Sequence, residues 1–237
     1  MGKSSFRRPS PGAVPACLAI VFLALFLASF APAFLVTAAM AESTPEIRRL
    51  EAAANQGDAV AQVRLGWLYE YGDRVPPDFA RAVTWYQLAA NLGDARGRYE
   101  LGMKHYDGKG VERDYAEALR LVTLAAEQGL AQAQYQLGLM YRRGLGSKPD
   151  FTKAVLWLRK AAGNGHPRAQ ARLGIMYMEG AGVERDDVEA YVLLSLADKK
   201  GIIAAKGRRP IVKRRLSPGQ LAAAEKRIAE RSRKASH

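Results

Sequence analysis

The chain has 237 residues and a formal net charge of +13, with three histidines and one cysteine. A single cysteine excludes a fold stapled by intrachain disulfides. The charge is uneven, because residues 42–198 hold 20 Lys and Arg against 21 Asp and Glu, whereas residues 199–237 hold 13 against 2. The central part is therefore almost neutral, and the basic excess lies at the C-terminal end.

Residues 1–41 have the pattern of an export signal. Three basic residues precede an apolar stretch from Cys17 to Val36, and Ala39 and Ala41 are small residues at the positions that a signal peptidase requires. The stretch approaches the roughly 20 residues that cross a bilayer, so an uncleaved inner-membrane anchor is the alternative. Both interpretations place the residues after 41 across the membrane, so we expect a periplasmic or secreted protein.

From Ala53 to Gly201 the sequence repeats every 36 residues without an insertion. The most regular columns are Leu65-Gly66, Leu101-Gly102, Leu137-Gly138 and Leu173-Gly174; Gly72, Gly108, Gly144 and Gly180; and Asp78, Asp114, Asp150 and Asp186. A fixed period of this length indicates a solenoid, in which each repeat buries its apolar face against its neighbours.

Apolar residues within one period follow helical spacing, which predicts two helices per repeat. In the second repeat the first helix is expected to run from about Asp94 to Asp107 and to end at Gly108. Asp114 is then the N-cap of the second helix, and Glu117 completes a capping-box-like pair. The glycine of each Leu-Gly pair lies mid-helix, where it is expected to let two helices approach closely.

The pattern of residues 133–146, continued by residues 150–162, resembles the Sel-one-like repeat (SLR) family, which is related to the tetratricopeptide repeats. The resemblance covers about residues 46–201. It implies an all-α fold, an α/α solenoid (superhelix) of about four 36-residue helix-turn-helix repeats with terminal cap helices. We expect an N-terminal half-repeat helix in residues 42–57, the solenoid in residues 58–201 and a basic cap or tail in residues 202–237.

The analogy with tetratricopeptide repeats implies that the first helix of each repeat lines a groove. The aromatic and arginine residues expected there are Trp67, Arg96, Tyr99, Tyr106, Tyr135, Arg142 and Arg168. Such a mixture is typical of binding hot spots. The alternative is that half of these positions only fill gaps between helices.

The basic C-terminal segment has two interpretations. Ser217, Pro218 and Gln220 form a helix-start signal, followed by an apolar stripe, which predicts a terminal cap helix. The alternative is contact with an anionic membrane or cell-wall surface. The residues that would make this contact are Arg208, Arg209, Lys213, Arg214 and Arg215. No aromatic residue lies among these cations, and an exported chain rarely meets nucleic acid, so no nucleic-acid partner is expected.

The sequence contains little that suggests catalysis. His105, His166 and His237 have no partners at metal-ligand spacing, so neither a metal nor another cofactor is expected. The serine-acylation motifs expected of a penicillin-binding or β-lactamase-like hydrolase are absent. The favoured function is a non-enzymatic scaffold, adaptor or regulator of the bacterial envelope that binds a protein or peptide. An envelope hydrolase, or binding to a wall glycan or anionic lipid through the tail, is the alternative.

Overall fold

The computed structural model of the protein describes residues 44–234. The expected export signal, its cleavage site and Cys17 lie outside the described residues. The helices are α2 (Pro45–Asn55), α3 (Ala59–Tyr71), α4 (Phe79–Asn91), α5 (Ala95–Asp107), α6 (Tyr115–Glu127), α7 (Ala131–Arg143), α8 (Phe151–Gly163), α9 (Pro167–Glu179), α10 (Asp187–Lys199), α11 (Ile203–Lys213) and α12 (Pro218–Lys234). Within residues 44–234 no helix is both long and apolar enough to cross a membrane.

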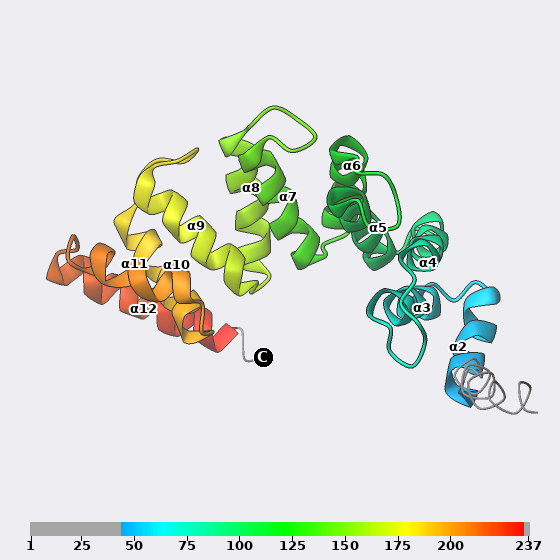
Figure 1. Ribbon diagram of the computed structural model, residues 1–237. Coiled ribbons are helices and arrows are strands. Elements are labelled where there is room, and N and C mark those ends of the chain that lie inside the picture. The colour runs from blue at the N-terminus through cyan, green and yellow to red at the C-terminus, as the bar shows by residue number, and fades with distance from the viewer. Residues whose placement is uncertain (1–43, 235–237) are drawn as a thin grey trace, which may run out of the picture. The chain divides into compact units, whose positions relative to one another are not determined.

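From α2 to α11 each helix packs on the next one in the chain, and α12 packs on α10 (Figure 1). Four pairs, α3 with α4, α5 with α6, α7 with α8 and α9 with α10, make the repeats, and the second helix of each of the first three pairs packs on the first helix of the next. We call α3, α5, α7 and α9 the A helices and α4, α6, α8 and α10 the B helices. The predicted fold class, an all-α solenoid of helix-turn-helix repeats, is confirmed.

The helix ends follow from the periodic Asp and Gly columns. Asp114 accepts hydrogen bonds from the backbone N–H groups of Ala116 and Glu117, at 2.8 and 3.0 Å, and so caps α6. Gly108 ends α5 with a φ of 72°, a left-handed conformation that favours glycine. The reciprocal half of the expected capping box does not form. The Glu117 carboxylate binds Arg120 instead, and the N–H of Asp114 donates to the carbonyl of His105.

The mid-helix glycines lie where A and B helices come closest. A Cβ placed on Gly138 would lie 2.7 Å from Cγ of Leu158 and 3.2 Å from the carbonyl oxygen of Ala154. Both atoms belong to α8, and the carbonyl is backbone that a side-chain rotation cannot move. The structure therefore confirms that this glycine column permits close helix packing.

Two further helices cover the C-terminal end of the repeats. Val212 of α11 and Ala224 and Ile228 of α12 are buried in one apolar cluster with residues of α10. The start of α12 has the predicted capping box, because Ser217 N–H donates to Oε1 of Gln220 at 2.9 Å and Gln220 N–H donates to Oγ of Ser217 at 3.3 Å. These helices are the terminal caps expected of a solenoid, and they shield the apolar face of the last repeat.

Candidate functional site

The A helices carry all seven residues that the sequence assigns to a groove. Trp67 lies on α3, Arg96, Tyr99 and Tyr106 on α5, Tyr135 and Arg142 on α7, and Arg168 on α9. Two of the arginines are exposed, and four of the seven residues are half-buried. We call the surface formed by the exposed parts of these helices the A-helix face.

Tyr99 is the exception, because the structure places it in the core. Its side chain is only 7% exposed and packs in one cluster with Val122 and Leu137. Burial, with a further contribution from the charge of Glu100, raises the pKa of Tyr99 to about 12. Tyr99 therefore fills the space between helices instead of presenting a ring to a partner.

The junction of the first and second repeats brings two of the predicted residues together. The guanidinium of Arg96 lies 5.3 Å from the ring centroid of Trp67, within cation–π range. Trp67 also lies close enough to Glu100 to lower the pKa of its carboxyl. Tyr71, at the end of α3, is 74% exposed. This end of the A-helix face therefore presents aromatic rings held by neighbouring charges.

A buried polar cluster that the sequence analysis missed lies at the same junction. Lys104 of α5, which is 3% exposed, forms an ion pair with Oε1 of Glu70. The hydroxyl of Tyr86, from α4, donates to Oε2 of Glu70 at 2.8 Å. We call these three residues the Glu70 cluster. Each buried charge in it has a partner, as burial requires.

The signal for the Glu70 cluster was present in the repeat columns. Lys104 occupies the position of Met140 and Met176 in the later repeats, and Tyr86 that of Leu158 and Leu194. Two core positions thus change from apolar to polar in neighbouring helices. A paired departure of this kind indicates that the two side chains share a partner.

Glu100 makes the stability of this junction dependent on pH. Burial raises the pKa of its carboxyl, the charge of Glu70 raises it further, and the contacts with Trp67, Lys104 and Arg96 oppose the rise. Because the folded pKa lies above the ordinary value of 4.5, the stabilisation that Glu100 contributes is full below that pH and is lost as the pH rises through the folded pKa.

We therefore expect Glu100→Gln to be more stable than the wild type at pH 7, by a margin that shrinks as the pH approaches 4. Glutamine has nearly the same size and shape as glutamate without its charge, and Gln136 occupies the same position in α7. Urea unfolding of both proteins at pH 7 and pH 4 measures the effect. An equal difference in the free energy of unfolding at the two pH values would contradict it.

The third and fourth repeats present a different part of the A-helix face. The ring of Tyr135 stacks on His166, with centroids 4.6 Å apart and an interplanar angle of 22°. Nδ1 of His166 accepts from the N–H of Ala169 at 3.2 Å and so caps α9, while burial and the charge of Arg168 lower the pKa of the imidazole. Arg142 and Arg168 project here, and neither makes an ion pair with any residue of the described part of the chain.

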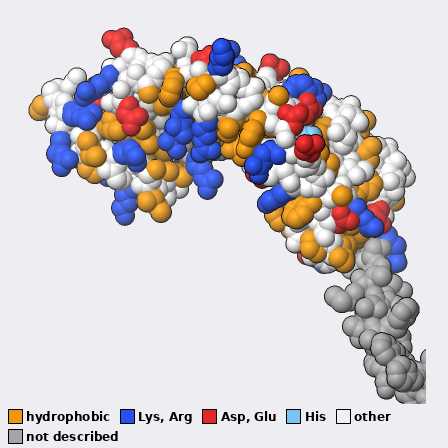
Figure 2. All heavy atoms as spheres, turned by 45° about the horizontal axis from the view of Figure 1, so that its top comes forward, with side chains coloured by type: hydrophobic (Ala, Val, Ile, Leu, Met, Phe, Trp, Pro, Cys, Tyr) orange, Lys and Arg blue, Asp and Glu red, His pale blue; other side chains and the backbone are white. Residues whose placement is uncertain are grey.

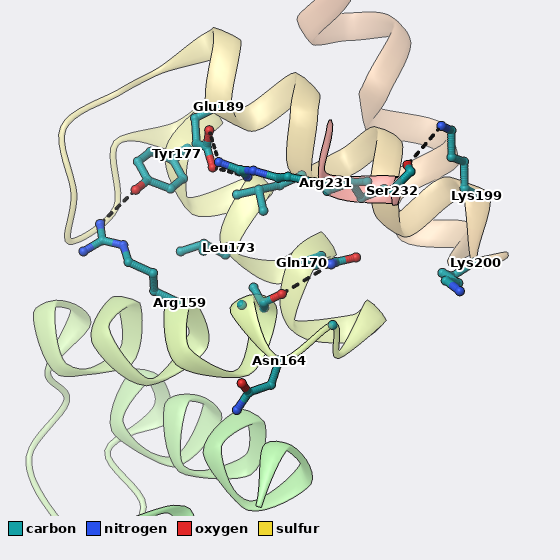
Figure 3. Close-up of a pocket in the computed structure, with 15 residues that line it drawn as sticks. Arg159, Asn164, Gln170, Leu173, Tyr177, Glu189, Lys199, Lys200, Arg231 and Ser232 are labelled. Carbon is teal, nitrogen blue, oxygen red and sulfur yellow. Dashed lines mark hydrogen bonds and ion pairs between the residues drawn. The ribbon is translucent and has the colours of Figure 1, made fainter. Parts of the chain in front are cut away.

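A pocket of about 1150 Å³ lies between α8, α9, α10 and α12 (Figure 3). Several polar side chains that line it form hydrogen bonds and ion pairs with one another. Arg159 donates to the Tyr177 hydroxyl at 2.8 Å, and Arg231 forms an ion pair with Glu189 at 2.7 Å. Apolar side chains of α9 and α10 also line the space, among them Leu173. The pocket thus has a basic rim whose arginines are already engaged.

The chemistry available in this pocket is limited. Lys199 donates to the hydroxyl of Ser232 at 3.4 Å, but a lysine needs a desolvated position to act as a base, and Lys199 is exposed. Among residues 44–234 no group of three or more His, Cys, Asp and Glu could hold a metal ion.

Comparison with known proteins agrees with the division of the chain into four helix pairs. A model of the Sel1 repeat family matches four consecutive units, residues 59–94, 95–130, 131–166 and 167–201, which together make up more than half of the chain. The chain belongs to the Sel1 repeat family. Each unit begins at the first residue of an A helix, and the resemblance noted in the sequence is confirmed.

Solved structures of Sel1 repeat proteins resemble this one over part of their length. A Sel1 repeat protein from Oxalobacter formigenes is 33% identical, with a TM-score of 0.59 over 63% of this chain and 62% of that chain. The protective antigen c5321 of uropathogenic Escherichia coli, which has an SLR fold, is 29% identical, with a TM-score of 0.49 over 77% of this chain and 47% of that chain. The chain thus spans less than two thirds of either relative. Comparison with curated proteins gave no match. Sel1 repeats are protein-interaction repeats, and the family is typically a non-catalytic scaffold.

The basic tail of this Sel1 repeat protein is partly neutralised by the repeats. Arg209 forms an ion pair with Asp198 at 3.1 Å, and Arg215 forms one with Asp187 at 3.3 Å. The other three predicted contact residues, Arg208, Lys213 and Arg214, are exposed and make no ion pair within residues 44–234. On the face shown in Figure 2, Lys and Arg side chains outnumber acidic ones over the C-terminal helices. Two of the five cations therefore hold the cap to the solenoid.

Proposed function

We propose that this Sel1 repeat protein is a non-enzymatic scaffold of the bacterial cell envelope that binds a protein or an extended peptide on its A-helix face. The observation that supports this proposal is the row of aromatic and arginine side chains that the four A helices present, from Trp67 and Tyr71 to Tyr135 and Arg168. Trp, Tyr and Arg side chains are enriched among the few residues that dominate binding energies at interfaces. The membership of the Sel1 repeat family supports the same function class.

The envelope location is proposed from the sequence of residues 1–41. We expect the exported protein to begin at Glu42, because Ala39 and Ala41 fit the cleavage geometry. The intact mass of the protein recovered from the envelope fraction measures this. A product that retains Cys17 would support the membrane-anchor alternative, and a full-length product in the cytoplasm would contradict export.

The binding surface can be tested by pull-down from envelope extract. We expect the variant Tyr71→Ala/Arg96→Ala/Tyr135→Ala to lose a partner that the wild type captures, because it removes exposed or half-buried side chains from three A helices. The matched control is Arg120→Ala/Leu156→Ala, which removes exposed side chains from two B helices. Circular dichroism should show native helix content in both. Capture by the A-helix variant, with loss by the B-helix control, would move the binding site to the other face.

A further inference from the structure

Two columns of the repeat meet where one A helix lies beside the next. The first column holds Glu70, Tyr106, Arg142 and Met178, and the second holds Arg64, Glu100, Gln136 and Arg172. At the first junction Glu70 and Glu100 are close enough for the charge of one to affect the other. At the third junction the same two positions hold Arg142 and Arg172, which also interact electrostatically. The charge of this paired site therefore reverses from acidic to basic along the A-helix face.

The two ends differ in how their charges are compensated. Glu70 has Lys104 and Tyr86 as partners, and Trp67, Lys104 and Arg96 all favour the charged form of Glu100. Within residues 44–234, by contrast, Arg142 and Arg172 have no ion-pair partner. The acidic junction is satisfied by the chain itself, and the basic junction is not.

Arg142 shows the cost of this arrangement most directly. Its Nε is buried from solvent and has no hydrogen-bond acceptor. Burial lowers the pKa of its guanidinium, and the charges of Arg172 and Arg143 lower it further, while the smaller effects of Tyr135 and Glu179 act in the opposite direction. A buried donor without an acceptor, next to a like charge, destabilises a fold unless an ion or ligand satisfies it. The site is therefore prepared for an anionic group.

We propose that Arg142 and Arg172, with Arg168 one turn earlier on α9, bind a carboxylate of an acidic segment of the peptide or protein partner. The inference rests on the proposed function, since it assigns the partner's chemistry at this end of the A-helix face. A guanidinium binds a carboxylate through paired N–H donors. Arg142 and Arg172 are half-buried, and neither guanidinium is already engaged in an ion pair within residues 44–234. The stacked Tyr135 and His166 rings give the neighbouring surface an apolar patch for the peptide chain.

The same charge reversal gives the partner a direction. An acidic segment placed at the first junction would meet the carboxylate of Glu100, which repels it, and Glu70, which is already paired with Lys104. Only the third junction offers unpaired guanidinium groups in the same two columns. Repulsion at one end and attraction at the other select a single orientation of the bound chain.

The chain itself offers matched substitutions for the test. Arg142→Met introduces the residue that the fourth repeat has in this column, Met178, and Arg172→Gln introduces Gln136 of the third repeat. The control Arg64→Gln makes the same change in the same column of the first repeat, away from the proposed site. A second control, Arg208→Gln/Lys213→Gln/Arg214→Gln, removes tail cations that could attract an acidic peptide on their own.

The probe is a fluorescein-labelled ten-residue peptide with four consecutive glutamates, compared with the same peptide carrying glutamines, in fluorescence anisotropy with the full chain. We expect the glutamate peptide to bind the wild type and the glutamine peptide not to bind it. Both Arg142→Met and Arg172→Gln should weaken binding of the glutamate peptide at least tenfold. Both controls should stay within about twofold. The acidic peptide should also raise the melting temperature of the wild type and not that of Arg172→Gln. A cooperative melting transition of Arg172→Gln without peptide, near the wild-type temperature, shows that this variant is folded.

Any one of the following results would overturn the proposal. The first is no binding of the acidic peptide to the wild type, and the second is equal weakening in Arg64→Gln or in the tail variant. The third is displacement of the peptide by inorganic phosphate at equal concentration, which would indicate a small-anion site. If the A-helix variant loses the captured partner while Arg172→Gln keeps it, the proposed function stands and the carboxylate site falls.

Discussion

Lys104→Met is expected to destabilise the protein by about 3–5 kcal/mol, since it removes one partner of a buried ion pair and leaves the Glu70 carboxylate with only the Tyr86 hydroxyl. The size of the new side chain does not cause this loss of stability, because methionine fills the same position at Met140 and Met176. The loss comes from the uncompensated charge of Glu70. The free energy of unfolding in urea measures the loss.

The rest of the Glu70 cluster supplies the control. The triple variant Glu70→Met/Tyr86→Leu/Lys104→Met introduces the residues that the fourth repeat carries in these three columns. Replacing a whole buried ionic group with apolar side chains of similar volume is often neutral or stabilising. We therefore expect the triple variant to be at least as stable as the wild type. If Lys104→Met alone were as stable as the wild type, the ion pair would have no structural role.

Gly138→Leu is expected to destabilise the third repeat by about 1–3 kcal/mol or more, because α7 and α8 cannot separate without losing the contacts between them. The first carbon of the new side chain would already lie 2.7 Å from Cγ of Leu158, and the carbonyl of Ala154 blocks the other direction. Thermal unfolding followed by circular dichroism, together with urea titration, measures the cost.

Gly163 is a matched control for this substitution. It lies at the end of α8, and a Cβ placed on it meets nothing within 4 Å. Gly163→Leu should leave stability unchanged or raise it slightly, because leucine has a higher helix propensity than glycine. An equal loss of stability at Gly138 and Gly163 would show that helix contact is not what excludes a side chain at Gly138.

The regular part of the fold could be predicted from the sequence because it depends on local and periodic signals. Asp114 caps the helix that follows it, and Gly108 ends the helix before it, through contacts with residues a few positions away. The hydrogen bond predicted between the Glu117 carboxylate and the N–H of Asp114 was wrong because the prediction used this local motif alone. A local motif cannot state that Arg120, one turn further on, competes for the same carboxylate.

The candidate site was predictable only as a set of helix faces. Periodicity placed Tyr99 and Tyr135 in the same column, and yet one is core and the other half-buried. Small differences in how neighbouring repeats pack decide this exposure, and a 36-residue period treats all repeats as equal. The contacts of Tyr86 and Lys104 were not predicted, because these residues lie on different helices and spacing along the chain does not show that both bind Glu70.

The sequence by itself determined the family, the helical repeat and the positions of the turns, because a 36-residue column pattern and its caps are encoded in residues near one another. Only the tertiary structure decided which side chains share a partner. It paired Arg209 and Arg215 with carboxylates of α10 and left Arg142 without an acceptor. Such contacts join residues of different helices, and their energy depends on burial and on distances between side chains, which no spacing along the chain contains.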